Sequence, residues 1–492
     1  MENKENKQAG ATVKDSFLDF SGLRTEEPIN KKVIISFAAA IIVYIICSSL
    51  PIDSYGEGTA RALGMLFGMI TFSMFWPYSI AVPALMCAVV GVIIKVWDWS
   101  GVSSALGSSP MYTLVGMQFV ALGCEFTPFG QRMAYTFLKK FAKKPILLVM
   151  ALAFVTALIS AFVSNLAVMI MMSGIAASLL EAMGEKPGES KIGRTLMMLV
   201  TAMTMIGGAV LICGSPSGNG RAIGFLESTA NVSITFGQWA AFGIPSFIIY
   251  FVPVCFIYIK CTGLKSSSVK ILPESYYDEK LKSLGPIGGS EIRWLLIVAG
   301  MIVALLLGMN TGFAALTFGF IAMLPVIGVV PPEKAVRKVQ WANVLALCTF
   351  GLLGTLFSNT GLGDFVNDML KPIVGNMSPV IYCMFACLIT GLCVNLFVNA
   401  NIAVCAMCIT IFSSVCVSLG YNPTVIMAPS LAIVSFFYCM GANTMVLLNK
   451  GYGYWEMKDT VLPGFLSIIL ISIVYPLVTC VVAPIIGLSL YM

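Results

Sequence analysis

Two related stretches decide the fold of this chain: SNLAVM at residues 164–169 and ANIAVC at residues 400–405. A glycine-containing turn and a short amphipathic stretch precede each of them, with TPFG at 127–130 and TGLG at 360–363. The two turns are separated by nearly the same number of residues as the two stretches, which indicates a duplicated unit. Many secondary transporters form a substrate site from duplicated units with polar breaks at membrane depth. The pattern therefore favours transport across a membrane.

The composition is typical of a membrane-embedded chain. Hydrophobic residues make up 58% of the 492 residues and charged residues only 11%, whereas soluble domains have roughly 45–50% and 25%. Residues 33–50 and residues 62–94 carry no charge. The second run exceeds the roughly 20 residues of one span, so we expect a break near Pro77 or Pro83. The sequence predicts an all-α polytopic protein surrounded by membrane lipid.

The net charge of +6 is an indicator of topology and not of nucleic-acid binding. Basic clusters lie at residues 139–144 and 334–338, at equivalent places in the two units, and Lys31 and Lys32 precede the first apolar run. Basic loops remain on the cytoplasmic side of a membrane. We therefore expect a cytoplasmic N-terminus in the cell (inner) membrane, with no cleavable signal and a polar tail at residues 1–32.

The cysteine and histidine counts exclude several classes of function. Most of the 15 cysteines lie in apolar runs, where Cys behaves as a small hydrophobic residue, and there is no histidine. CAMC at residues 405–408 has no second pair at zinc-binding spacing. Without histidine, Ser-His-Asp and Cys-His catalysis are excluded. We expect no enzyme activity, no cofactor and no metal beyond an alkali cation.

The polar residues at the first break are suited to binding ions. Ser160 and Ser164 share one helical face because they are four residues apart, and Asn165 follows where the helix is interrupted. Their oxygens, with freed backbone carbonyls, suit a hard monovalent cation, and nearby half-helix N-termini favour an anion. The alternative is that Ser and Asn only join helices by hydrogen bonds. The recurrence of Asn-aliphatic-Ala-Val in the second unit favours ion binding.

A second polar stretch follows each break. CGSPSGNGR occupies residues 213–221, where we expect irregular backbone at 214–220, and GANT occupies residues 441–444. Gly, Ser and Pro in a row unwind a helix and expose amides and carbonyls. No strand precedes the glycines, which argues against a dinucleotide loop. Arg221 could pair with a carboxylate substrate, or its side chain could extend to the membrane interface.

These motifs together resemble the divalent anion/sodium symporters, a family that includes dicarboxylate and citrate carriers. LISAFVSN at residues 158–165 resembles the family's Ser-Asn-Thr hairpin tip, and GG at 207–208 leading to GSP at 214–216 is similar to its Gly-Thr-Pro-Pro-Asn turn. Residues 341–362 resemble the opening of the second repeat. The resemblance covers most of the chain from about residue 33 onward.

The resemblance implies about eleven transmembrane spans in two inverted repeats, two re-entrant hairpins and a homodimer. It also implies a transport domain that moves like an elevator against a scaffold. The expected division is a cytoplasmic tail at 1–32, scaffold helices at 33–108, a first repeat at 109–259, a linker at 260–293, scaffold helices at 294–340 and a second repeat at 341–492.

Site residues follow from the same resemblance. The first sodium site would comprise Ser160, Ser164, Asn165 and Gly214, and the second Asn399, Asn401 and Asn443. The substrate would contact Ser164, Asn165, Asn401, Ser215, Pro216, Arg221 and Thr444. The chain departs from the family at Leu166 and Ile402, where the family has threonines, and at Ala400, where it has serine. GANT lacks the usual prolines.

These departures predict a less polar pocket, suited to a monocarboxylate, a sulfonate or a carboxylate with an apolar body. The predicted function is secondary transport of a small organic anion coupled to a cation, with Na⁺ expected. Two alternatives remain: a sodium-independent anion exchanger, and an antiporter of the same superfamily for arsenite efflux or Na⁺/H⁺ exchange. The sequence has no recurring stretch that could form a selectivity filter of backbone carbonyls, which argues against a channel.

Overall fold

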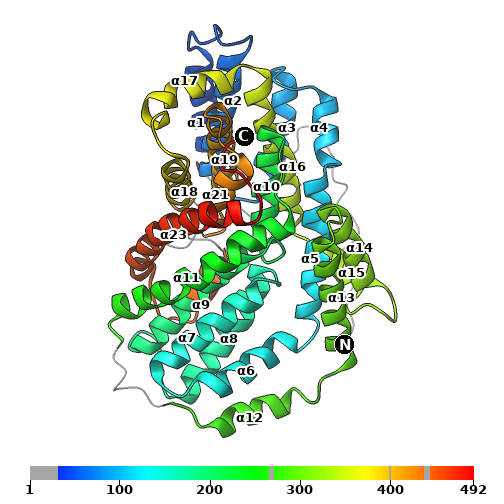
Figure 1. Ribbon diagram of the computed structural model, residues 1–492, viewed down its shortest axis with the longest axis vertical. Coiled ribbons are helices and arrows are strands. Elements are labelled where there is room, and N and C mark those ends of the chain that lie inside the picture. Colours follow the sequence, from blue (N-terminus) through cyan, green and yellow to red (C-terminus); the bar gives the residue numbers. More distant parts are fainter. Residues whose placement is uncertain (1–30, 265–270, 398–399, 437–443) are drawn as a thin grey trace, which may run out of the picture.

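The computed structural model describes residues 31–264, 271–397, 400–436 and 444–492, and in these residues the fold is helical (Figure 1). The described residues contain no strand, only an isolated bridge between Tyr421 and Tyr491. The prediction of an all-α protein is confirmed.

Two series of helices repeat in the same order. The first comprises α5 (Ser109–Glu125), α6 (Phe129–Phe141), α7 (Pro145–Ser160), α8 (Asn165–Ala182), α9 (Lys191–Val210), α10 (Pro216–Ala230) and α11 (Phe236–Thr262). The second comprises α16 (Trp341–Asn359), α17 (Leu362–Val374), α18 (Pro379–Leu396), α19 (Asn401–Ser418), α20 (Pro423–Ile426), α21 (Ala428–Ile433), α22 (Thr444–Lys450) and α23 (Met457–Ile485). The duplication inferred from the two asparagine stretches is therefore present in the helices.

The remaining helices flank these series. They are α1 (Lys31–Ser48), α2 (Thr59–Phe75), α3 (Ala81–Ile93), α4 (Trp99–Leu106), α12 (Glu274–Ser283), α13 (Gly289–Leu306), α14 (Thr311–Met323) and α15 (Pro332–Lys338). The break expected in the long apolar run lies between α2 and α3 and contains Pro77, whereas Pro83 lies in the first turn of α3. α12 lies within the predicted linker.

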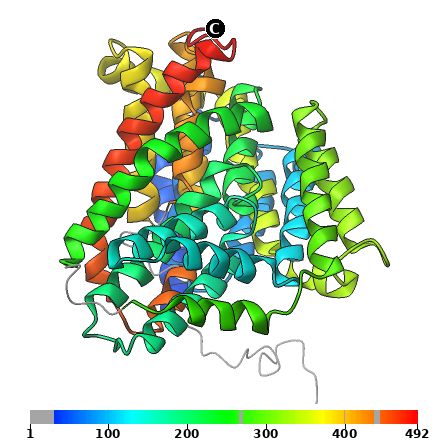
Figure 2. The same ribbon diagram turned by 60° about the horizontal axis from the view of Figure 1, so that its bottom comes forward.

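The two helical hairpins enter the molecule from opposite ends. The hydroxyls of Tyr276 on α12 and Ser178 near the end of α8 are 3.1 Å apart, so the outer end of the α7–α8 hairpin lies at the α12 end of the molecule. Tyr421, just after α19, donates to the Met377 carbonyl just before α18, which closes the outer end of the second hairpin near α17. Figures 1 and 2 show α17 and α12 at opposite ends. The repeats are inverted, as predicted.

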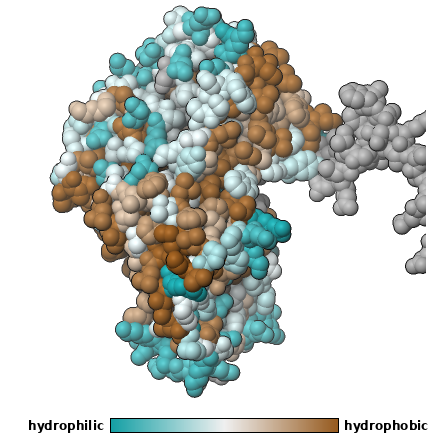
Figure 3. All heavy atoms as spheres, turned by 90° about the vertical axis from the view of Figure 1, so that its right-hand side faces the viewer, coloured by the Kyte–Doolittle hydropathy of each residue, from teal (hydrophilic) through white to brown (hydrophobic). Residues whose placement is uncertain are grey.

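Hydropathy agrees with a membrane protein. Eight helices among the described residues are long and apolar enough to cross a membrane, or nine if the bent pair α15–α16 counts as one span. Five shorter apolar segments add to these, and broken spans are built from such pieces. Figure 3 shows apolar side chains over the middle of one face and hydrophilic side chains at both of its ends.

One predicted irregular stretch is wrong. Residues 214–220 are not irregular throughout, because α10 begins at Pro216 and only residues 211–215 separate it from α9. Proline is favoured at the first helical position, where its missing N–H is not needed and its φ is already helical. The segment 211–215, called the break below, thus separates α9 from α10.

Glycines allow the helices to cross closely. A Cβ on Gly207 of α9 would lie 2.4 Å from the backbone of Ala157 on α7, and one on Gly116 of α5 would lie 2.3 Å from that of Ala315 on α14. Small residues at such crossings are typical of membrane proteins, because packing and not water exclusion holds their helices together.

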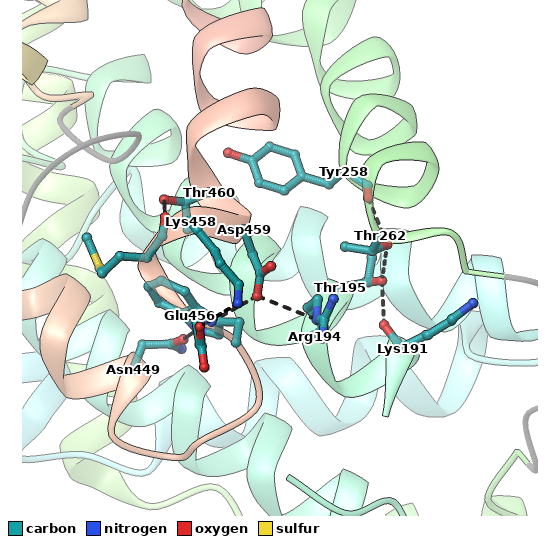
Figure 4. Close-up of polar contacts among 12 residues, drawn as sticks. Lys191, Arg194, Thr195, Tyr258, Thr262, Asn449, Glu456, Lys458, Asp459 and Thr460 are labelled. Carbon is teal, nitrogen blue, oxygen red and sulfur yellow. Dashed lines mark hydrogen bonds and ion pairs between the residues drawn. The ribbon is translucent and has the colours of Figure 1, made fainter. Parts of the chain in front are cut away.

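Polar contacts tie the start of α9 to the start of α23 and to the end of α11 (Figure 4). Arg194 at the start of α9 lies 3.6 Å from Asp459 on α23, and the hydroxyls of Thr195 and Thr262 are 2.7 Å apart. Asn449 of α22 donates to Ser173 of α8 at 2.6 Å. These contacts join both repeats at one end of the molecule.

Arg132 fastens the amphipathic helix α6 to α13. Its Nε and Nη2 donate to the two oxygens of Glu291 at 2.9 and 3.0 Å, and its Nη1 donates to the Gly285 carbonyl at 2.9 Å. The Glu291 side chain is only 1% exposed. A carboxylate this deeply buried depends on its partner.

Arg132→Gln is expected to destabilise the protein by about 3 kcal/mol, because it leaves the Glu291 charge buried without compensation. The matched control is Lys139→Gln, since Lys139 on the same helix pairs with Asp278 in an exposed bridge. Thermal unfolding in detergent should show a clear drop for Arg132→Gln and little change for the control. Equal unfolding midpoints for the Arg132→Gln and Lys139→Gln variants would contradict the role assigned to Arg132.

Candidate functional site

The tip of the first hairpin, residues 160–165, is held by its own polar side chains. Ser160 ends α7, and its hydroxyl donates to the Thr204 carbonyl of α9 at 2.7 Å and to Asn165 Oδ1 at 3.1 Å. Ser164 caps α8 by accepting from the Ala167 N–H at 3.4 Å. Ser160 and Asn165 are buried, whereas Ser164 is partly exposed. The tip therefore gathers oxygen atoms beside the start of a helix.

The tip meets the break between α9 and α10. Asn165 Nδ2 donates to the hydroxyl of Ser215, the residue that precedes α10, at 3.4 Å. A Cβ on Gly208 would lie 2.2 Å from Asn165 Oδ1, and one on Gly214 would lie 2.5 Å from the Ser160 carbonyl. Only glycine allows this approach, so the sequence GG at 207–208 has a direct structural reason.

Asn219 holds the break from the other side. Its Nδ2 donates to the carbonyls of Gly208 and Leu211 at 2.8 and 2.9 Å, with a longer bond to Ile212. Its Oδ1 accepts from the Ser435 hydroxyl at 3.1 Å, and Ser435 lies just after α21 in the second repeat. Asn219 thus satisfies carbonyls left free where α9 ends and links α10 to the segment just after α21 in the second repeat.

A small pocket of about 10 Å³, room for about one water molecule, lies at the tip and shares part of its wall with a larger cavity. Its wall includes Ser164, Asn165, Leu166, Ser215, Pro216 and, from the second repeat, Met445. The larger cavity, called the vestibule below, has a volume of about 710 Å³ and shares Ser164 and Leu166 with the pocket. Glu125 and Lys338, which form an ion pair, also line the vestibule.

The structure brings together the four residues predicted for the first sodium site with two predicted substrate contacts: Ser160, Ser164, Asn165 and Gly214, and Ser215 and Pro216. Hydroxyl, amide and carbonyl oxygens in this arrangement suit an alkali cation. The start of α8 at Asn165 and the start of α10 at Pro216 both border the pocket, and helix N-termini favour an anion there.

The second site is described only in part. Asn401 begins α19, and Ala400 before it provides no side-chain cap, unlike Ser164. Asn399 and Asn443 lie outside the described residues. Thr444 is the first residue of α22.

Arg221 lies away from the pocket. It follows Pro216 by more than one turn of α10, is partly exposed, and lies close to Cys405 of α19. Within the described residues, no hydrogen bond or ion pair engages its guanidinium. Its predicted contact with substrate stays a prediction.

Sequence reasoning missed three contributors to the site. Gln118 of α5 and Gln340, just before α16, line both the pocket and the vestibule. Ser435 contacts Asn219 from the second repeat. The signal for Gln118 was present, because it is the one amide side chain within the uncharged stretch 111–124.

Comparison with known proteins assigns this sequence to a family. Residues 69–437 match the family model CitMHS, described as a citrate transporter. The chain belongs to this family. The resemblance to dicarboxylate and citrate carriers, inferred from the hairpin tip and the turn, is confirmed.

Individual relatives agree with this assignment. The chain is 23% identical over 471 residues to a protein named sodium-dependent dicarboxylate transporter SdcS from Staphylococcus saprophyticus, covering 89% of each chain. It is also 23% identical over 413 residues to the protein of that name from Staphylococcus aureus RF122, covering 78% of each chain.

Two solved membrane transporters share the fold. MtrF of Neisseria gonorrhoeae, whose structure is described as illuminating a class of antimetabolite efflux pumps, has a TM-score of 0.52 at 11% identity, covering 79% of this chain and 84% of MtrF. YdaH of Alcanivorax borkumensis, described as having an unusual topology, has a TM-score of 0.52 at 12% identity, covering 91% of this chain and 96% of YdaH. At these identities the likeness concerns the fold alone.

Proposed function

We propose that this protein is a secondary transporter that moves a small carboxylate together with Na⁺ across the cell membrane. The observation that carries the proposal is the hydrogen-bonded chain Ser160–Asn165–Ser215, which joins a hairpin tip to a broken helix at the wall of a pocket. Such junctions in transporters bind ions and anions together. The relatives named sodium-dependent dicarboxylate transporters support the choice of cation and of substrate class.

Cation and anion are expected to bind side by side. Ser160, Ser164, Asn165 and Gly214 would surround Na⁺, and the anion would lie at the starts of α8 and α10. The bound cation offsets repulsion between the substrate charge and nearby carbonyls. Each ligand should therefore raise the affinity of the other.

The pocket wall supports a substrate with an apolar portion. Leu166, Pro216 and Met445 face the pocket together with the polar residues of the tip. Apolar side chains favour a carbon skeleton over a second charged group. A monocarboxylate, or a carboxylate with an apolar body, suits this wall better than a compact dianion.

The distribution of charge supports an orientation with the α12 end in the cytoplasm. Basic residues concentrate there: the clusters at 139–144 and 334–338, and Lys280, Lys282, Lys450 and Lys458. The helix ends near α17 carry Arg61, Lys95 and Lys371. Positive loops remain cytoplasmic, and Lys31 and Lys32 at the start of α1 support the same side for the N-terminus.

Elevator movement and a homodimer belong to the same proposal. The hairpin α7–α8 packs on α9, and α10 packs on α19, so the hairpins and broken helices form one body that could move together. Apolar side chains of α13 and α14, among them Leu296 and Phe313, are exposed and face lipid or a second copy.

Uptake into proteoliposomes tests the proposed function. A panel of labelled mono-, di- and tricarboxylates should show uptake of at least one, and an inward Na⁺ gradient should accelerate it over a K⁺ gradient. Uptake that does not depend on Na⁺ but requires an anion enclosed in the proteoliposomes would favour the sodium-independent exchanger. The lack of a side-chain cap at Ala400, where Ser164 provides one in the first repeat, is the observation behind that second candidate.

Arg221→Gln tests the predicted substrate contact of Arg221, which would form in a conformation other than this one, since Arg221 lies away from the pocket here. Substrate affinity is expected to weaken by roughly tenfold, because a charge-assisted contact would be lost. The unfolding midpoint should stay unchanged, since within the described residues no ion pair depends on this guanidinium. Arg61→Gln, a change of the same kind on α2, serves as the control. A matching loss of stability and of transport would instead give Arg221 a packing role.

A further inference from the structure

Two glutamines face the hairpin tip from outside it. Gln118 lies on α5 and Gln340 at the bend between α15 and α16, and both line the small pocket and the vestibule. They therefore lie where the small pocket and the vestibule meet, a position called the neck below. Gln118 is 7% exposed, so its amide is almost completely buried.

The two side chains are held in place by hydrogen bonds. Gln118 Oε1 accepts from the Gln340 backbone N–H at 2.9 Å, and Gln340 Oε1 accepts from Asn343 Nδ2 at 2.5 Å. Their carbonyl oxygens are therefore engaged. Gln118 Nε2 donates one bond of 3.3 Å to the Leu114 carbonyl, and within the described residues Gln340 Nε2 has no acceptor.

This arrangement leaves amide N–H groups available at the neck. An amide nitrogen carries two donors, and a carboxylate is purely an acceptor. Neutral donors attract a carboxylate more weakly than Lys or Arg would, so an anion can reach the tip without being retained. The charged residues nearest in the vestibule, Glu125 and Lys338, neutralise one another in an ion pair.

We propose that Gln118 and Gln340 bind a carboxylate oxygen of the substrate at the neck and thereby contribute to its selection. This inference rests on the proposed function and adds residues to the same site. Because these residues belong to α5 and the α15–α16 bend and not to the hairpin, their contact would be made only when the tip faces the vestibule. They would act as a docking position for the anion as it enters or leaves.

Gln340→Glu tests the proposal with an isosteric change that adds a negative charge at the neck. The KM for the transported carboxylate should rise by roughly tenfold or more, because like charges at an interface disfavour each other strongly. The Na⁺ concentration for half-maximal stabilisation, measured without substrate, should stay unchanged. Gln340→Leu, which removes the donors without adding charge, should also raise KM.

Gln131 provides the matched control. It lines the vestibule but not the pocket, and it is exposed. Gln131→Glu adds the same charge to the same cavity away from the neck and should leave KM within about twofold. Equal KM values for the Gln340 and Gln131 variants, with wild-type transport intact, would overturn this inference alone. Absence of carboxylate transport by the wild type would overturn the proposed function as well.

Discussion

Asn165→Ala should abolish sodium-dependent uptake, with a loss of Na⁺ affinity on the order of 100-fold. Asn165 Oδ1 accepts from Ser160 and its Nδ2 donates to Ser215, so one side chain joins the hairpin tip to the break. Truncation removes the donor to the buried Ser215 hydroxyl, while Ser160 keeps its bond to the Thr204 carbonyl, so the loss falls on the link between the tip and the break. Initial uptake rates at saturating Na⁺, and Na⁺ titrations of thermal stability, measure the effect.

Asn165→Asp separates the two proposed roles of this residue. The carboxylate is nearly isosteric and provides oxygen to a cation, so Na⁺ should still stabilise the protein. The added negative charge lies beside the proposed anion position, so substrate affinity should fall by roughly tenfold or more. If Asn165→Ala retained wild-type uptake and Na⁺ dependence, the cation site would have to lie elsewhere.

Gly208→Ala should be nearly as damaging as Asn165→Ala. Its Cβ would lie 2.2 Å from Asn165 Oδ1, a distance at which one of the two groups must move. Gly208 lies in buried α9, and overpacking in a tightly packed interior costs about 1–3 kcal/mol. We expect loss of most uptake together with a moderate fall in the unfolding midpoint.

Gly220→Ala is the matched control for this substitution. Gly220 lies only a short distance along the chain, on α10, and nothing lies within 4 Å of the position where its Cβ would be. Because alanine favours a helix over glycine, this variant should fold at least as well as the parent and transport normally. Comparable loss in both variants would mean that α9 and α10 both tolerate no added methyl group, and that the contact with Asn165 is not the specific cause.

The first hairpin could be predicted because its signal is local. The stretch 145–180 carries no charge, and Ser164 and Asn165 stand where its two helices meet; the structure has α7 and α8 as a hairpin. The repeat could be predicted for the same reason, since Asn165 and Asn401 each begin the second arm of a hairpin.

The neck could not be predicted, because its residues meet only through packing. Gln118 and Gln340 are separated by 222 residues, and their contact depends on how α5 lies against the start of α16. Asn219 lay within a stretch that the sequence analysis singled out, but its partners depend on where α9 ends. The start of α10 was predicted too late in the chain, because the glycines and serines of residues 214–220 indicated irregular backbone although Pro216 begins a helix.

The amide of Asn219 has a consequence for the return half of the transport cycle. It occupies the carbonyls at the end of α9, so the break keeps its hydrogen bonds whether or not an ion is bound. A carrier whose core needed bound substrate to keep its hydrogen bonds could not change conformation when unloaded. It could then only exchange one anion for another. In the proposed cycle, Asn219 would hold the break together in the unloaded carrier. We therefore expect it to travel back empty, which is the condition for uphill accumulation driven by an ion gradient.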